Sequence, residues 1–177
     1  MTQAHLFTLQ LILGYVAWLL CHRAYIWPWL TSMPTVDAHR LIATLHSFRF
    51  FGLVFVIPGV TSASLPASFA SSAAYGDLAA GMLAILALLT VRVRPLFWTF
   101  VIAFNVVGMI DLLLNYVHAI RAGLPAAAGN LGAAYAIPVL YVPLLMITHG
   151  TALVLLMRTR HREPTAVRPA DATVAPH

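Results

Sequence analysis

Five long apolar stretches, separated by short polar connections, constrain the fold of this chain more than any other feature. They cover about residues 6–24, 35–59, 73–91, 95–121 and 134–157. A helix needs about 20 apolar residues to cross the hydrocarbon core of a membrane, and each stretch supplies enough. Charged residues make up only 8% of the chain, against about a quarter in a soluble domain. The sequence therefore predicts an all-α fold, a five-helix transmembrane bundle, with residues 1–158 as one transmembrane domain.

The arginines predict how this bundle is oriented. If all five stretches cross, eight of the ten basic residues, all of them arginines, fall on one side of the membrane or in the tail. They are Arg23, Arg40, Arg92, Arg94, Arg158, Arg160, Arg162 and Arg168. Cytoplasmic loops are enriched in such residues, so we expect the N-terminus outside and the C-terminus in the cytoplasm. The expected location is the cell (inner) membrane, as a multi-pass protein, with residues 159–177 forming a disordered cytoplasmic tail.

Several classes of function lack the residues they require. The arginines sit in short loops and a tail rather than on a basic face with interleaved aromatic residues, so the lipid bilayer is the expected partner and nucleic acid is not. Cys21 is the only cysteine, which excludes a disulfide framework and a CxxCH haem-attachment site. Neither a phosphate-binding glycine loop nor a G-x-S-x-G nucleophile motif is present. The sequence therefore indicates no particular reaction.

Three charged residues fall deep inside the predicted spans. With a helix rise of about 1.5 Å per residue, Arg49 lies about 20 Å above the cytoplasmic start of the second span, and Asp111 about 24 Å above the start of the fourth. Asp77 enters from the outer end of the third span. A charge at membrane depth costs about 2.5–3.5 kcal/mol on insertion scales and normally has a partner. We therefore expect Arg49 to meet Asp111, and Asp77 as well through its forked guanidinium.

A polar stripe on the fourth span extends this expected cluster. Asn105 and Asn115 recur at helical spacing with Asp111 and Gly108, which places them on one face turned to the bundle interior. One interpretation is a site for a small polar or anionic ligand or a proton relay, in which Arg49 supplies positive charge and Asn105 orients the ligand. The other is a structural clamp that ties three helices together.

Two histidines support a different hypothesis. His46 and His149 lie at matched depth on the second and fifth spans, and two facing histidines are the usual ligands of haem b in a helical bundle. The plainer interpretation is that each ring hydrogen-bonds a backbone carbonyl or a threonine. A zinc or di-iron site would need a third converging ligand, for which Asp111 is the candidate across a gap of about 10 Å.

From about residue 46 to residue 112 the chain resembles a group of uncharacterised bacterial multi-pass membrane proteins. The resemblance rests on four motifs: Arg49-x-x-Gly52, Leu65-Pro66 with Phe69-Ala70, Gly76-Asp77, and Asn105-x-x-Gly108-x-x-Asp111-Leu112. It implies a shared fold and a shared cluster of Arg49, Asp77 and Asp111, without an assigned activity.

The leading hypothesis is therefore a small-ligand-binding or accessory membrane protein whose site is Arg49, Asp77, Asp111, Asn105 and Asn115. One alternative is a haem- or quinone-dependent membrane redox protein that uses His46 and His149. Another is a structural subunit that packs against other membrane subunits in a larger complex.

Overall fold

The computed structural model describes residues 1–160, which form helices and connections without a named strand. The predicted tail, 159–177, lies outside these residues except for its first two, which continue the last helix. In chain order the elements are α1 (Gln3–Cys21), the π-helix η1 (His22–Ile26), α2 (Trp27–Ser32), α3 (Thr35–Ser47), the 3₁₀-helix η2 (Phe48–Val56), α4 (Ala67–Leu89), α5 (Arg94–Arg121), the 3₁₀-helix η3 (Leu124–Tyr135), the π-helix η4 (Ile137–Tyr141) and α6 (Val142–Arg160).

Within residues 1–160, four helical stretches are long and apolar enough to cross a membrane. They are Gln3–Ser32, Ala67–Leu89, Arg94–Arg121 and Ile137–Arg158. The first joins α1, η1 and α2 into one stretch of 30 residues, and its most apolar part is only 11% buried inside the protein. A helix this apolar and this exposed needs an apolar surrounding, which is the environment that lipid provides.

The segment predicted as the second span, 35–59, is divided in two. Its first part is the regular helix α3, and its second part is the tighter 3₁₀-helix η2, which ends at Val56. Four phenylalanines and two valines crowd the nine residues of η2. Aromatic and β-branched side chains lose rotamer freedom against the preceding turn of an α-helix, which weakens the α conformation there. Arg49 lies in η2, two residues after the change.

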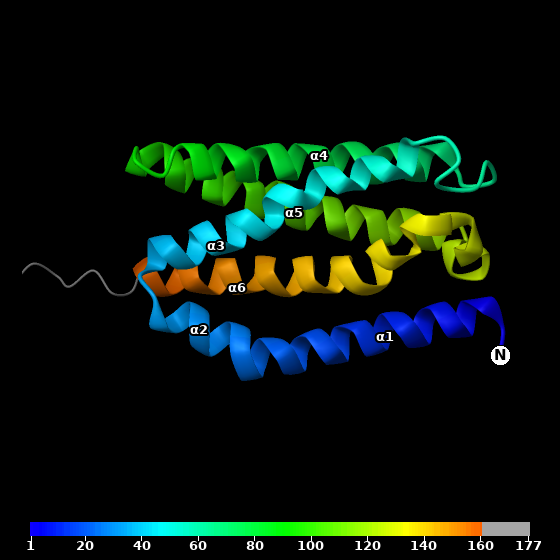
Figure 1. Ribbon diagram of the computed structural model, residues 1–177, viewed down its shortest axis with the longest axis horizontal. Helices are drawn as coiled ribbons and strands as arrows, with labels where there is room; N and C mark the ends of the chain where they lie inside the picture. The colour runs from blue at the N-terminus through cyan, green and yellow to red at the C-terminus, as the bar shows by residue number, and fades with distance from the viewer. Residues whose placement is uncertain (161–177) are drawn as a thin grey trace, which may run out of the picture.

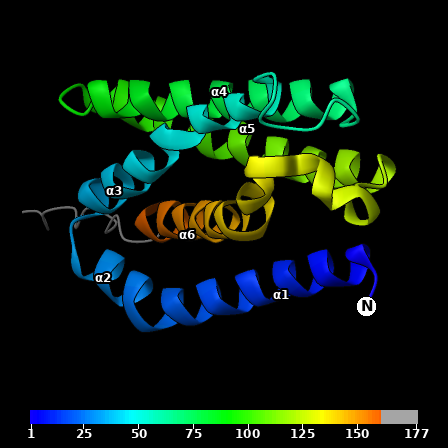
Figure 2. The same ribbon diagram turned by 45° about the vertical axis from the view of Figure 1, so that its right-hand side comes forward.

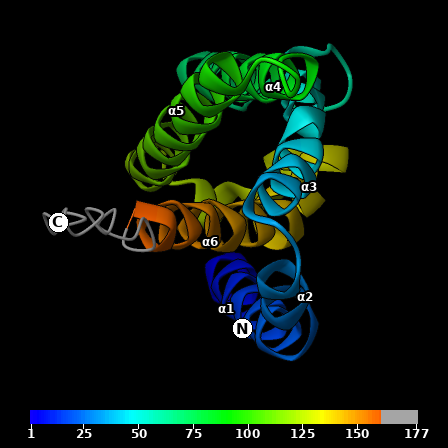
Figure 3. The same ribbon diagram turned by 90° about the vertical axis from the view of Figure 1, so that its left-hand side faces the viewer.

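The helices run roughly side by side along the long axis of the molecule (Figure 1, Figure 2). Viewed from one end, α3, α4, α5 and α6 surround a common centre, whereas α1 and α2 lie outside this ring next to α6 (Figure 3). The N-terminus lies at the end opposite the connection between α2 and α3 (Figure 1). Residues from four helices are thereby directed toward one interior.

Two apolar cores occupy this interior, one toward each end. The first contains Phe55, Phe69 and Leu131, and the second contains Ile42, Phe97 and Ala152. Along α3–η2, α4, α5 and η4–α6 alike, buried polar residues separate the positions that belong to the two cores. They are His46, Arg49, Asp77, Asn105, Asp111, Thr148 and His149. A polar layer therefore divides the bundle between its apolar halves.

Candidate functional site

Arg49 is the centre of the polar layer and is fully buried. Its Nε donates to Oδ1 of Asp77 at 2.8 Å, and its Nη2 donates to Oδ2 of Asp111 at 2.6 Å. Nη2 also lies 2.7 Å from the same oxygen of Asp77. Nη1 donates to Nε2 of His149 at 3.1 Å. All three guanidinium nitrogens are thus engaged, and one side chain joins η2 to α4, α5 and α6.

Three glycines make space for this arrangement. A Cβ on Gly52 would collide with the carboxylate of Asp77, and one on Gly76 would collide with the carboxylate of Asp111. A Cβ on Gly108 would meet both Nη1 of Arg49 and the ring of His149. Close packing around a charged group is possible here only because these positions lack side chains. The sequence motifs included all three glycines, but only the contacts reveal that each faces a charged or ring atom.

His149 has one possible tautomer in this network. A guanidinium only donates, so Nε2 of His149 must accept from Arg49 and carry no hydrogen. Nδ1 therefore carries the hydrogen and donates to Oδ1 of Asn105 at 3.0 Å. The amide nitrogen of Asn105 in turn donates to the carbonyl of Val101 at 2.7 Å. His149 is consequently neutral, and Asn105 supports His149 rather than contacting either carboxylate.

The haem hypothesis does not fit this geometry. The ring centroids of His46 and His149 are 3.9 Å apart, with the ring planes tilted by 40°, which leaves no space for a porphyrin between them. Nε2 of His46 lies 3.0 Å from the Thr148 hydroxyl, which itself donates to the carbonyl of Leu144 at 2.9 Å. The histidine is therefore the donor, and the Nε2 atoms of both rings are occupied by hydrogen bonds. Threonine pairing, the plainer interpretation from the sequence, is what His46 adopts.

No group of three or more His, Cys, Asp or Glu side chains is placed to hold a metal ion among residues 1–160. Asp111 is held by Arg49 and by the amide nitrogen of Asn115, which donates to its Oδ1 at 3.1 Å. The third ligand that the zinc or di-iron interpretation required is thus committed to other partners.

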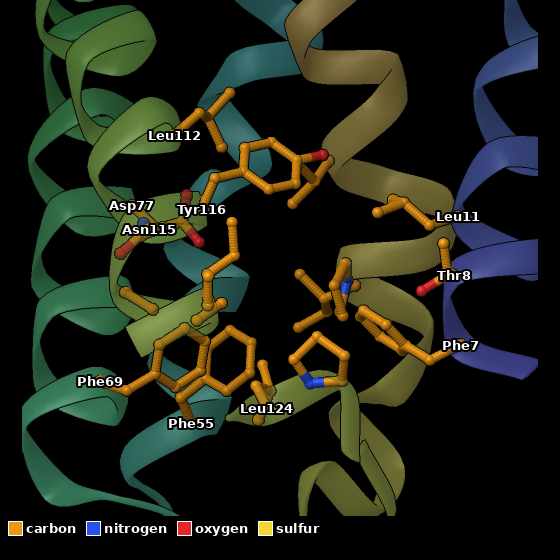
Figure 4. A pocket seen from close by; sticks show the side chains of 17 residues that line it. Phe7, Thr8, Leu11, Phe55, Phe69, Asp77, Leu112, Asn115, Tyr116 and Leu124 are labelled. Carbon is orange, nitrogen blue, oxygen red and sulfur yellow. The ribbon is translucent and has the colours of Figure 1, made fainter. Parts of the chain in front are cut away.

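A cavity of about 240 Å³ lies directly beside the ion cluster (Figure 4). Asp77 and Asn115 stand at one side, and Phe7, Thr8 and Leu11 of α1 stand at the opposite side (Figure 4). Phe55, Phe69 and Leu124 close a further part of the wall. Neither Arg49 nor the two histidines line it. Asp77 is therefore shared between the buried ion cluster and the wall of an almost entirely apolar cavity.

The atoms of Asn115 and Asp77 that Asp111 and Arg49 leave without a hydrogen bond are acceptors. Because a carboxylate cannot donate, the amide of Asn115 must turn its nitrogen to Asp111, which fixes its Oδ1 as the remaining atom. That Oδ1 is buried without a hydrogen-bond partner among the described residues. Oδ1 of Asp77 receives both contacts from Arg49, and its Oδ2 lies against Gly52 without a hydrogen bond among the described residues. The hydroxyl of Tyr116, another lining group, is 2.7 Å from that of Tyr15.

A family model described as a domain of unknown function (DUF8737) matches residues 6–157. The chain belongs to this family. The matched range contains the complete ion cluster and every residue that lines the cavity of this DUF8737 chain. Neither the comparison with curated proteins nor that with solved structures finds a match.

Sequence reasoning missed the cavity and the part that α1 plays in it. Phe7, Thr8 and Leu11 recur at helical spacing, but an apolar helix gives no signal that separates a cavity wall from a lipid-facing surface. The irregular helices η3 and η4 supply Leu124 and Ile137 to the wall of the DUF8737 cavity. Pro125 and Pro138, which also line it, were the available signal for irregular backbone.

Proposed function

We propose that this protein is a membrane protein that binds a small, largely apolar molecule in the cavity beside Asp77. The observation that carries the proposal is the position of Asp77, which is both a partner of Arg49 and part of the cavity wall. Binding sites for small molecules are typically apolar cavities with a few fixed polar groups, and this cavity has that composition.

The size of the cavity supports a small ligand. An apolar cavity of about 150 Å³ is enough to hold benzene. The 240 Å³ available here therefore accommodates a ring or a chain of about six carbon atoms. Arg49 does not line the cavity. Its role in this proposal is to position the carboxylate of Asp77, which it holds through two nitrogens.

We further propose that the chain crosses the cell (inner) membrane five times. At a rise of about 1.5 Å per α-helical residue and 2.0 Å per 3₁₀ residue, α3 and η2 together extend about 38 Å, against a hydrocarbon thickness of about 30 Å. His39, His46 and Arg49 are fully buried in the bundle interior, whereas the exposed charged residues Asp37 and Arg40 lie near the start of α3. A short α-helix extended by a 3₁₀-helix is therefore long enough to be the fifth crossing.

The proposed orientation has the N-terminus outside and the C-terminus in the cytoplasm. Arg92 and Arg94 lie where α4 meets α5 and Arg40 lies near the start of α3, at the end of the bundle where α2 meets α3 (Figure 1). Arg23 lies in η1, between α1 and α2, and Arg121 ends α5 at the opposite end of the bundle. This asymmetry follows the rule that cytoplasmic ends carry the arginines. The lipid bilayer is then the surrounding partner, and the cavity lies in the outer half.

The binding proposal is tested by what the protein carries out of the membrane. Ala119 lines the cavity, and Ala79 is an exposed residue of α4 that does not line it. Native mass spectrometry of wild type, Ala119→Leu and Ala79→Leu, each purified from cell membranes, compares their bound small molecules. We expect one species in wild type and Ala79→Leu that is absent from Ala119→Leu. Identical spectra for all three variants would contradict the proposal.

A further inference from the structure

We infer that the ligand of this cavity has a hydrogen-bond-donating head group, a primary ammonium or a hydroxyl, that binds Asp77 and Asn115 while its apolar part contacts the aromatic wall. The inference rests on the proposed binding function and specifies the chemical class of its ligand. The sequence predicts a polar or anionic ligand for which Arg49 supplies positive charge. The inference replaces an anionic ligand with one that donates hydrogen bonds.

Arg49 is not available to an anion. Its three guanidinium nitrogens already contact Asp77, Asp111 and His149, and the residue is fully buried and absent from the cavity wall. An anionic head group would have to displace a carboxylate from it. That exchange would leave the displaced carboxylate unpaired in an apolar interior, which is strongly unfavourable.

Oδ1 of Asn115 and the carboxylate of Asp77 can only accept hydrogen bonds, whereas the hydroxyls of Thr8 and Tyr116 at the cavity can also donate. Oδ1 of Asn115 is buried and unpaired among the described residues, and Oδ2 of Asp77 makes no hydrogen bond there. A buried acceptor without a partner costs free energy, and a ligand that donates to it removes this cost. A ligand that only accepts, such as a ketone or a carboxylate, leaves both oxygens unpaired.

The charge of the cluster favours the same class of ligand. Two carboxylates face one guanidinium, and His149, which also contacts the guanidinium, accepts its hydrogen bond and is neutral. With both carboxylates ionised, one formal negative charge is left beside the cavity. In a medium of low dielectric constant this charge attracts a cationic head group and repels an anionic one over several ångströms.

Four ligands of nearly equal size separate these possibilities: hexylammonium, 1-hexanol, 2-hexanone and hexanoate. Thermal unfolding of the wild-type protein in nanodiscs of phosphatidylcholine, a lipid without net charge, is followed against the concentration of each ligand. Ala119→Leu, whose side chain fills the cavity, is measured in parallel. The change in its unfolding temperature measures the effect that each ligand has through the lipid. The additional change in wild type gives an apparent Kd for the cavity.

We expect at least one of the two donors, hexylammonium or 1-hexanol, to bind tenfold more tightly than either acceptor, a difference of about 1.4 kcal/mol. Asn115→Leu should reduce that ratio. An acceptor that binds within tenfold of the better donor would overturn the inference on the head group and leave the binding function in place. If all four ligands act on wild type and Ala119→Leu alike, the binding function itself fails.

Discussion

Arg49 donates from Nη1 to Nε2 of His149 over 3.1 Å, so α6 holds the guanidinium together with the two carboxylates of α4 and α5. The hydrogen bond also determines the tautomer of His149 and directs its Nδ1 to Asn105. A side chain that is held from three helices has one orientation. The carboxylate of Asp77, which borders the cavity, takes its position from this fixed group.

Removal of Arg49 alone should destabilise the protein more than removal of the whole charge cluster. Arg49→Met leaves two buried carboxylates without a counter-charge, and loss of one partner of a buried ion pair costs about 3–5 kcal/mol. The triple variant Arg49→Met, Asp77→Asn, Asp111→Asn carries no such charge and should unfold at a higher temperature than the single variant. Thermal unfolding in nanodiscs measures both.

The same triple variant separates a binding site from a clamp. If it folds and still carries the small molecule that we expect in wild type, the cluster only ties the helices together. Loss of that molecule from a folded triple variant is the outcome that we expect, because the head group would no longer meet a carboxylate at Asp77.

The glycine contacts predict opposite effects for one substitution at two helical positions. Gly108→Ala places a methyl group against Arg49 and His149 and should destabilise the protein. Gly150→Ala, in α6, meets nothing within 4 Å. It should raise the free energy of unfolding by about 0.5–1 kcal/mol, because alanine loses less conformational freedom in a helix than glycine. Chemical denaturation of both variants in one detergent tests the pair, and equal effects would contradict the close packing.

Two buried histidines should respond differently to the same replacement. His149→Phe leaves a hydrogen of Arg49 and the oxygen of Asn105 unpaired, which costs about 1–3 kcal/mol for each buried group. Neither ring nitrogen of His39 has a partner in the described part of the chain, and its ring packs edge-on against Trp98 at 5.2 Å. His39→Phe should therefore be neutral or stabilising. A larger loss at His39 than at His149 in thermal unfolding would contradict this reading of the network.

Cysteine labelling tests the fifth crossing and the orientation together. Ser32 and Ser64 are exposed and flank the segment formed by α3 and η2. In a Cys21→Ser background, Ser64→Cys should react with a membrane-impermeant maleimide on intact spheroplasts, and Ser32→Cys only after permeabilisation. Reaction of both on intact spheroplasts would mean that α3 and η2 do not cross. The reverse pattern would mean that the orientation is inverted.

The ion pairs of Arg49 could be predicted from the sequence because their cost is local and large. A charge deep in an apolar segment requires a partner. From the helix rise per residue, Arg49 and Asp111 are expected at nearly the same depth in the membrane. The structure has their side chains 2.6 Å apart. The residue at which α3 changes to a 3₁₀-helix could not be derived in the same way, because it also depends on how closely the backbone at Ser47 and Phe50 approaches Gly81 of α4.

The hydrogen bonds of His149 and the presence of the cavity could not be predicted from the sequence, because both depend on how the helices pack. His46 and His149 stand at matched depth, and depth alone does not distinguish two ligands of a haem from two rings in direct contact. The partner of each ring nitrogen depends on how each helix is rotated about its own axis, which the sequence does not define. The cavity exists because α1, η3 and η4 leave a volume unfilled, and an unfilled volume is a property of packing rather than of residue type.

A density map of the protein in lipid nanodiscs with hexylammonium shows whether the ligand occupies the cavity. We expect elongated density between Phe7 and Phe69 that ends about 2.7–3.2 Å from oxygens of Asp77 and Asn115, with Arg49 still joined to both carboxylates. Absence of density in the cavity would contradict the binding site. A guanidinium of Arg49 turned away from Asp77 and Asp111 would contradict the organisation from which the site was derived.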